Sequence, residues 1–241
     1  MTHFFFNIII NMNKNNIAVV IGNSGSIGSA IEKELSDQGF KNIIGFNRSS
    51  NPRLDLLNEE TIAQSAQFIK DKDTPVSLVF DATGLLHDDN NMPEKTYKNI
   101  DQIFMRKNFE INVMGPALIM KYFLPLLDKE EKSIFASISA KVGSISDNRY
   151  GGWYSYRASK AALNQMIKTA SIEMKMKNQN AICLAIHPGT VESKLSKPFQ
   201  KNDLTIQSPQ KSASNIFKIL TSSTSKDTGS FYNWDGKIID W

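Results

Sequence analysis

The sequence is short of cysteine, of metal-ligating clusters and of long apolar runs, and each shortage excludes a class of protein. Its 241 residues include one cysteine, Cys183, so an internal disulfide is impossible and a cysteine-based zinc site is not expected. His87 and His187 stand apart from further ligands, so no metal site is predicted. No apolar run approaches the ~20 residues of a membrane-spanning helix. We therefore expect a soluble protein of a reducing compartment, the cytoplasm.

An excess of one charge is also lacking. Lysine and arginine total 28, aspartate and glutamate total 24, and the net charge of +4 is spread along the chain. No basic stripe is present, so nucleic-acid binding is not predicted. The hydrophobic content of 41% is close to the globular average, and no repeat or linker divides the chain. A single large domain is expected.

Residues 1–15 differ from the rest of the chain. Three phenylalanines and three isoleucines are separated by Asn7 and followed by an asparagine-rich stretch. The run lacks a basic start and a small-residue cleavage site, so it does not resemble a secretory signal. A flexible tail, an added edge strand and an extension upstream of a start at Met12 all remain open. We expect a flexible extension over 1–15 and one domain over 16–241.

Strand and helix patterns alternate along this domain. Apolar runs predict strands at residues 17–21, 43–46, 76–80, 133–138, 181–186 and 229–233. Helical spacing and capping residues predict helices over 27–38, from Asn58, within 94–127, over 153–176 and from Ser208. The alternation predicts an α/β, doubly wound domain, with a parallel sheet covered by helices on both faces. The segment from Val191 to Ser208 is expected to be a mobile loop over the site.

A glycine-rich turn, Gly22-Asn23-Ser24-Gly25-Ser26-Ile27-Gly28, joins the first predicted strand to the first helix. Glycines at this spacing allow a sharp turn, a close approach of the backbone to a pyrophosphate and tight packing of helix on strand. The helix N-terminus adds free N–H groups and partial positive charge. The turn therefore predicts a dinucleotide-binding site.

The residues after the second predicted strand indicate which dinucleotide binds. A carboxylate there would bind the ribose diol of NAD(H), but this chain has Asn47-Arg48-Ser49-Ser50. The planar guanidinium of Arg48 suits a 2′-phosphate, so NADP(H) is favoured over NAD(H). Asp55 is a candidate contact for the adenine edge, with a plain turn carboxylate as the alternative.

Tyr156 and Lys160 lie four residues apart in a predicted helix and share one face. A free phenol titrates near a pH of about 10, and a neighbouring ammonium is expected to lower the pKa of Tyr156 toward the working range. Such a tyrosine donates a proton to a carbonyl oxygen while hydride reaches the carbon, and accepts it back in the reverse reaction.

Together these motifs resemble the short-chain dehydrogenase/reductase family over about Asn16 to Trp241. In the family's order the chain has Gly22-x-x-Gly25-x-x-Gly28, Asp81-Ala82-Thr83-Gly84, Asn112, Ile138-Ser139, Tyr156-x-x-x-Lys160 and Pro188-Gly189. The chain also resembles the C-factor and sniffer-like carbonyl reductase branch of this family. The residues that carry this likeness are Gly25, Tyr150-Gly151-Gly152-Trp153 and the closing Trp-Asp-Gly.

The resemblance implies a role for each matched residue. Tyr156 would be the acid/base, Lys160 would hold the nicotinamide ribose and lower the pKa of the phenol, and Asn112 would bind a water linking Lys160 to solvent. The cofactor site would include Ala82, Thr83, Gly84, Pro188, Gly189, Thr190 and Val191. The resemblance also suggests a homodimer or homotetramer formed through the long helices.

Three positions depart from the family's pattern. Ser26 stands where many members have glycine, and Ala82-Thr83 stands where Asn-Ala is common. The usual serine pair is Ser139-Ala140, so the serine that normally hydrogen-bonds the substrate carbonyl is an alanine. We predict that Ser139 takes this role, with Ser144 as the alternative.

These features predict an NADP(H)-dependent oxidoreductase that transfers hydride between nicotinamide and a carbonyl compound or secondary alcohol. A nucleotide-binding regulatory or signalling protein with little turnover is the alternative, and Ala140 favours it. An epimerase or dehydratase acting on a nucleotide-linked sugar would need a longer C-terminal part than the segment after Pro188 provides.

Overall fold

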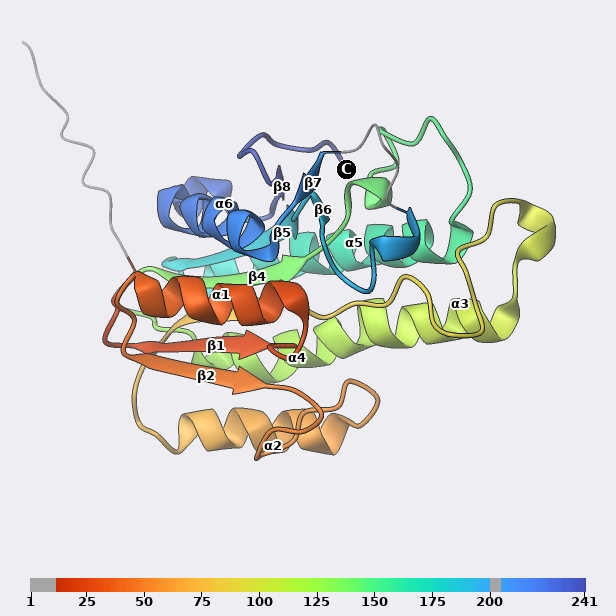
Figure 1. The fold of residues 1–241 in the computed structure, drawn as a ribbon. Coiled ribbons are helices and arrows are strands. Elements are labelled where there is room, and N and C mark those ends of the chain that lie inside the picture. Colours follow the sequence, from red (N-terminus) through yellow and green to blue (C-terminus); the bar gives the residue numbers. More distant parts are fainter. Residues whose placement is uncertain (1–11, 200–204) are drawn as a thin grey trace, which may run out of the picture.

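The computed structural model describes residues 12–199 and 205–241, and in these ranges the chain forms a six-stranded parallel sheet (Figure 1). The strands are β1 (Ile17–Ile21), β2 (Asn42–Phe46), β3 (Val76–Asp81), β4 (Ser133–Ile138), β5 (Ala181–His187) and β8 (Ser230–Asn233). They lie in the order β2-β1-β3-β4-β5-β8. The strand order reverses at β1, because β2 is added on one side of β1 and β3 on the other. A ligand crevice is therefore expected at the carboxyl ends of β1 and β3.

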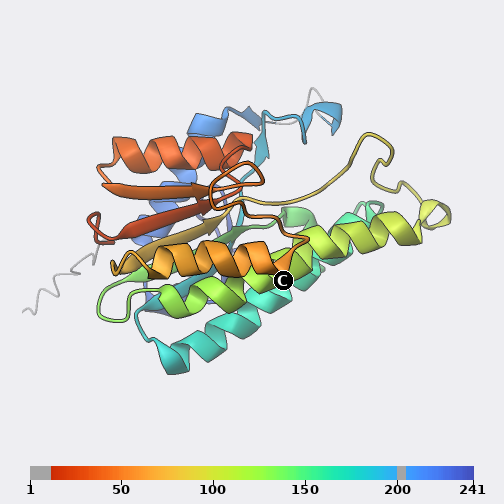
Figure 2. The same ribbon diagram turned by 90° about the horizontal axis from the view of Figure 1, so that it is seen from below.

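Helices cover both faces of the sheet, which confirms the doubly wound α/β fold (Figures 1 and 2). One face carries α1 (Ser26–Asp37) and α6 (Pro209–Ser222). The other carries α2 (Glu59–Lys70), α4 (Gly115–Phe123) and α5 (Tyr154–Lys177). A helix of eight residues, α3 (Gln102–Phe109), continues into α4 through a π-helical turn at Glu110–Met114.

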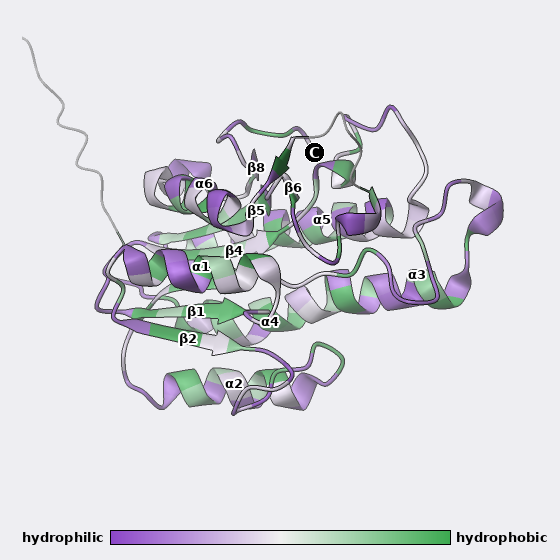
Figure 3. Ribbon diagram, viewed as in Figure 1, coloured by the Kyte–Doolittle hydropathy of each residue, from purple (hydrophilic) through white to green (hydrophobic). Residues whose placement is uncertain are grey.

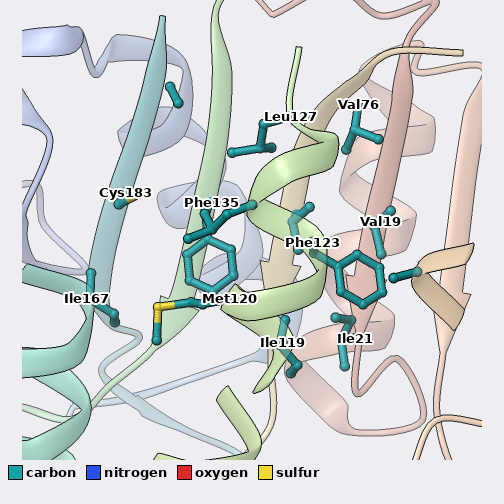
Figure 4. Packing of buried hydrophobic residues seen from close by; sticks show 14 of the residues in the cluster. Val19, Ile21, Val76, Ile119, Met120, Phe123, Leu127, Phe135, Ile167 and Cys183 are labelled. Carbon is teal, nitrogen blue, oxygen red and sulfur yellow. The ribbon is translucent and has the colours of Figure 1, made fainter. Parts of the chain in front are cut away.

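The strands are apolar because helices bury them from both sides. All five residues of β1 are buried. Val19 and Ile21 pack in one cluster with Phe123 of α4 (Figure 4), whereas Val20 belongs to the cluster on the α1 face. Burying each large apolar side chain contributes about 1.5–3 kcal/mol. Figure 3 shows the consequence for the sequence: β1 is hydrophobic throughout, while α1 alternates between hydrophilic and hydrophobic residues.

Two short parallel strands, β6 (Thr190–Val191) and β7 (Ile206–Gln207), pair the ends of the segment predicted as a mobile loop. Residues 200–204 of that segment lie outside the described residues. The 3₁₀ turns are Tyr97–Asn99, Leu124–Leu126, Lys141–Gly143, Lys197–Phe199 and Ser225–Asp227.

The described ranges contain no helix long and apolar enough to cross a membrane. They also contain no group of three His, Cys, Asp or Glu side chains placed to hold a metal ion.

The packed domain begins earlier than the sequence indicates. Met12 is 4% exposed and belongs to the core cluster on the α1 face. The carbonyl of Lys14 accepts a 3.0 Å hydrogen bond from the backbone N–H of Lys41. The Met12 side chain and the Lys14 backbone, which the sequence assigns to a flexible extension, therefore contact the domain. The expectation for residues 1–11 lies outside the described residues.

Candidate active site

The glycine turn has the geometry that a pyrophosphate requires. Gly22 has a φ of +84°, which favours glycine. A Cβ atom on Gly28 would lie 2.3 Å from the carbonyl oxygen of Gly22, so only glycine lets α1 start this close to β1. Gly25 is the N-cap of α1, and no side chain caps the helix. The first N–H groups of α1 are therefore available to an anion, and the turn fits a dinucleotide.

Asn23 ties this turn to the segment that follows β2. Its side-chain amide donates to Glu32 Oε1 at 2.9 Å and accepts from Asn47 Nδ2 at 2.7 Å. Burial raises the pKa of Glu32, although the Asn23 hydrogen bond opposes the shift. Ser24 and Ser26 remain exposed. The turn is thus held by half-buried amides while its outer side faces solvent.

Arg48 and Asp55 lie on the segments beyond β2. Arg48 is exposed and lies two residues after the strand. The carboxylate of Asp55 accepts from Arg53 Nη2 at 2.5 Å and from the backbone N–H of Leu57 at 3.2 Å. Asp55 is therefore paired within its own turn, which matches the plain turn carboxylate left open by the sequence.

The carboxyl end of β3 carries a buried acid that was noted in the motif but not predicted as a site residue. The carboxylate of Asp81 accepts from the N–H and hydroxyl of Thr83 at 3.0 and 2.6 Å, and from Ser137 Oγ at 2.7 Å. Desolvation raises the pKa of Asp81 even so. The signal that marks this residue is a carboxylate at the end of a buried, mostly apolar strand, because such a group needs several donors.

Tyr156 is buried near the start of α5, where it packs in a small cluster with Leu86 and Ala140. Its ring centroid lies 6.2 Å from that of Trp153. Burial raises the pKa of Tyr156 above its ordinary value of 10.0. This is opposite to the lowering that the sequence predicts from Lys160. The prediction was wrong for the protein alone because desolvation of the phenolate dominates.

Lys160 is 2% exposed, and its ammonium donates to the carbonyl of Ile138 at 2.9 Å. Burial lowers its pKa to about 8, while attraction to Asp81 opposes the shift. The Lys160 Nζ atom lies 5.9 Å from the ring centroid of Tyr156. A Cβ atom on Gly143 would lie 2.8 Å from Lys160 Cβ, so the loop after β4 packs closely on this lysine.

Asn112 lies in the π-helical turn and is fully buried. Its side chain accepts from the N–H of Leu85 at 2.7 Å and donates to the Leu85 carbonyl at 2.8 Å and to Ser159 Oγ at 3.0 Å. A Cβ atom on Gly84 would lie 3.3 Å from Lys160 Nζ and 3.5 Å from Asn112 Oδ1. The Asn112 amide and the Lys160 ammonium thus lie beside the same short backbone segment after β3, Gly84 and Leu85.

Both candidate serines are buried and hydrogen-bonded within the protein. Ser139 is 1% exposed and donates its hydroxyl proton to Asn164 Oδ1 at 2.6 Å. A serine polarises a carbonyl by donating, and this proton is already committed. Ser144 donates to a carbonyl of the C-terminal segment. Ala140, which carries no hydroxyl, is the residue packed against Tyr156. The Ser139 hydroxyl is therefore bonded to Asn164 and the Ser144 hydroxyl to the C-terminal segment.

The segment after β5 places Pro188–Val191 at the same edge of the sheet. Gly189 has a φ of +81°, and a Cβ atom there would lie 2.4 Å from Gln207 Nε2 and 2.9 Å from the ring of Trp234. Gln207 Nε2 is buried and has no hydrogen-bond partner among residues 12–199 and 205–241. A buried free donor at this edge is consistent with a polar ligand group, and sequence analysis did not identify it.

The chain matches known proteins along most of its length. The family model described as short chain dehydrogenase matches residues 16–204. The 1-hydroxy-2-glutathionyl-2-methyl-3-butene dehydrogenase of Rhodococcus sp. is 26% identical over 233 residues, which cover 92% of this chain and 98% of that protein. The C-signal protein of Myxococcus xanthus is 27% identical over 143 residues, covering 59% and 82%.

Solved structures show the same fold. The NADPH-bound carbonyl reductase from chicken fatty liver superposes with a TM-score of 0.84 at 22% identity, covering 96% of each chain. The carbonyl reductase Sniffer of Drosophila melanogaster has a TM-score of 0.81 at 21% identity, covering 94% of this chain and 99% of that one. These likenesses confirm the predicted resemblance, and the family-model match settles the classification. The chain is an oxidoreductase that belongs to the short-chain dehydrogenase/reductase family.

Proposed function

We propose that this protein reduces carbonyl compounds with NADPH and that Tyr156 is the proton donor. The observation that carries the proposal is the burial of Tyr156 and Lys160 on α5 beside the carboxyl ends of β3 and β4. Burial raises the pKa of the Tyr156 phenol, and the hydroxyl carries its proton at neutral pH, as it would at its ordinary pKa of 10.0. A protonated phenol suits an acid that supplies a proton to a carbonyl oxygen.

The other residues hold and orient the reactants. NADPH, when bound, supplies the hydride. The N–H groups at the start of α1 hold its pyrophosphate, and the Lys160 ammonium binds its nicotinamide ribose. Asn112 holds a water through which the proton lost by Tyr156 is replaced. Ala82, Thr83 and Gly84 line one side of the cofactor site, and the segment Pro188–Val191 lines the nicotinamide side.

Arg48 supports NADPH in preference to NADH. Arg48 is exposed two residues after β2, where its guanidinium can form a paired hydrogen bond with a 2′-phosphate. The neighbouring residues 47–50 contain no carboxylate that would bind the ribose diol and repel that phosphate.

The experiment is to measure NADPH oxidation at 340 nm with a panel of aldehydes, ketones and quinones. Tyr156→Phe is expected to bind NADPH within about twofold of the wild type and to lose at least about 100-fold in turnover, the size of general-acid catalysis. Tyr154→Phe is the matched control, because Tyr154 lies on the same helix but is 37% exposed. It is expected to turn over normally.

Other results would favour other functions. Full activity of Tyr156→Phe would refute the assignment of the acid. Tight NADPH binding without turnover on any carbonyl would favour a regulatory protein, for which Ala140 beside Tyr156 is the supporting observation. Product formation without net NADPH consumption would favour an epimerase or dehydratase.

We also propose that the chain forms a homodimer or homotetramer in the cytoplasm. The supporting observations are a groove of about 510 Å³ that α4 and α5 line together, and the exposed α5 side chains Ile172 and Met176. Light scattering on the wild type and on Ile172→Glu tests the assembly, because a charge in an apolar interface should dissociate it. The buried free thiol of Cys183 supports a reducing compartment, which cell fractionation tests.

A further inference from the structure

The start of α5 is held by a side chain from a distant part of the chain. Trp153, the N-cap residue, has a φ of 54° and makes no side-chain capping bond. Instead, the backbone N–H of Ser155 donates to both carboxylate oxygens of Glu94, at 3.3 and 3.2 Å, and its hydroxyl donates to Glu94 Oε1. The backbone N–H of Trp153 donates to the Glu94 carbonyl. Glu94 thus supplies the cap that α5 lacks locally.

Glu94 is an unusual residue to bury. It is 3% exposed, and a buried carboxylate is tolerated only where donors surround it. Its donors here are the backbone N–H and the hydroxyl of Ser155, the second residue of a 24-residue helix. The positive end of the helix dipole adds to their effect. The Glu94 carboxylate therefore gives the helix end an acceptor, and the helix end gives the buried carboxylate its donors.

The cap acts on the turn that carries the proposed acid. Tyr156 follows Ser155 directly and is the third residue of α5. Helix ends fray when their N–H groups lack partners, so this tyrosine lies where an uncapped helix is least ordered. Lys160 lies one turn further along, and its own bond to Ile138 holds it. Loss of the cap should therefore displace the phenol more than the ammonium.

We propose that Glu94 is a positioning residue: its carboxylate fixes the first turn of α5 and so holds the Tyr156 hydroxyl where it meets the substrate oxygen. The inference rests on the proposed function, because it assumes that Tyr156 is the acid. Displacing a reacting group by about 1 Å is enough to lower a rate about 100-fold. Cofactor binding, which depends on the glycine turn and Lys160, should change little.

The test compares Glu94→Ala with Glu94→Gln, which keeps an oxygen that accepts from Ser155. Glu94→Ala is expected to lower kcat about 10- to 100-fold, with the KM and Kd for NADPH within about twofold of the wild type. Glu94→Gln is expected to restore kcat to within about threefold. Asn58→Ala is the matched control: Asn58 caps α2 by accepting from the backbone N–H of Glu60 at 3.1 Å, and α2 carries no proposed catalytic group. It should lower the melting temperature and leave kcat unchanged.

Hydrogen exchange gives a readout that does not depend on activity. The amides of Ser155 and Tyr156 are expected to exchange faster in Glu94→Ala than in the wild type, Glu94→Gln or Asn58→Ala. Ser155→Ala, which loses only the hydroxyl bond, covers the case in which Glu94→Ala does not fold. It should lower kcat a few-fold.

The outcomes separate the two proposals. Wild-type kcat in Glu94→Ala, or in Ser155→Ala where the former does not fold, would overturn the positioning role if Tyr156→Phe is inactive in the same assay. An equal kcat loss in Asn58→Ala would also overturn it, because the effect would then reflect general stability. If the wild type itself reduces no carbonyl, the proposed function fails. The exchange rates then decide alone whether Glu94 orders the first turn of α5.

Discussion

Replacing Lys160 with methionine is expected to abolish turnover and at the same time to remove a destabilising buried charge. The lysine is 2% exposed and retains one hydrogen bond, to the carbonyl of Ile138. Burial lowers its pKa from 10.5 to about 8, even though the attraction of Asp81 opposes that shift. The charged form is thus less favourable in the folded protein than in the unfolded chain.

The size of the effect follows from the two pKa values. Each pKa unit corresponds to about 1.4 kcal/mol, so the lowering from 10.5 to about 8 represents about 3 kcal/mol of destabilisation below pH 8. Methionine removes this charge but leaves the Ile138 carbonyl without its donor, at a cost of about 1–3 kcal/mol. The net gain in the free energy of unfolding at pH 7 is therefore expected to be about 1 kcal/mol.

The pH dependence is the sharper test. Between pH 8 and 10.5 the folded wild type has released the Lys160 proton while the unfolded chain still binds it, so wild-type stability rises with pH through this window. Lys160→Met lacks this contribution. Its advantage over the wild type should therefore fall by about 3 kcal/mol between pH 7 and the top of the window.

Urea unfolding of the cofactor-free protein at several pH values measures this difference. Lys175→Met is the control, because Lys175 is an exposed lysine of the same helix and its replacement should change stability by less than about 0.5 kcal/mol at every pH. A difference between Lys160→Met and the wild type that does not vary with pH would refute the reasoning, since it would mean that Lys160 titrates alike in both states.

Four further substitutions test other parts of the site. Arg48→Ala should raise the KM for NADPH about tenfold or more and leave that for NADH unchanged; equal effects on both would exclude a 2′-phosphate contact. Gly28→Ala should weaken dinucleotide binding at least about tenfold in a fluorescence titration, because its Cβ would lie 2.3 Å from the Gly22 carbonyl oxygen, and unchanged binding would contradict the close approach. Ser139→Ala should lower the free energy of unfolding by about 1 kcal/mol and leave kcat nearly unchanged. Ala140→Ser should raise kcat several-fold. A large loss of kcat in Ser139→Ala would support the substrate-binding role predicted for that serine.

The fold was predictable because its signals are local and repeated. A buried parallel strand needs apolar residues on both faces, and Ile17–Ile21 is such a run, ended by a glycine turn. The capping residue Asn58 marks the start of α2 in the same way. The packing of Met12 was not predictable, because the neighbouring residues carry no periodic pattern and the contact depends on a cluster formed by distant helices.

The candidate site was predictable in its residues but not in its energetics. Spacing alone places Tyr156 and Lys160 on one face of a helix. Whether their mutual influence exceeds desolvation depends on the depth of burial, which spacing does not reveal. Which acceptor the Ser139 hydroxyl bonds depends likewise on the packing of side chains around it, which brings Asn164 within reach. These details arise from long-range contacts.

Glu94 illustrates how an absence could have served as a signal. It lies 61 residues from Ser155, and no local pattern links the two. The start of α5 is nevertheless conspicuous, because a tryptophan stands where a serine, threonine, aspartate or asparagine is usual. A long helix that carries a proposed catalytic residue in its first turn and lacks a local cap must obtain its acceptor elsewhere. Buried acids on the preceding connections are therefore the residues to examine, and Glu94 is one of them.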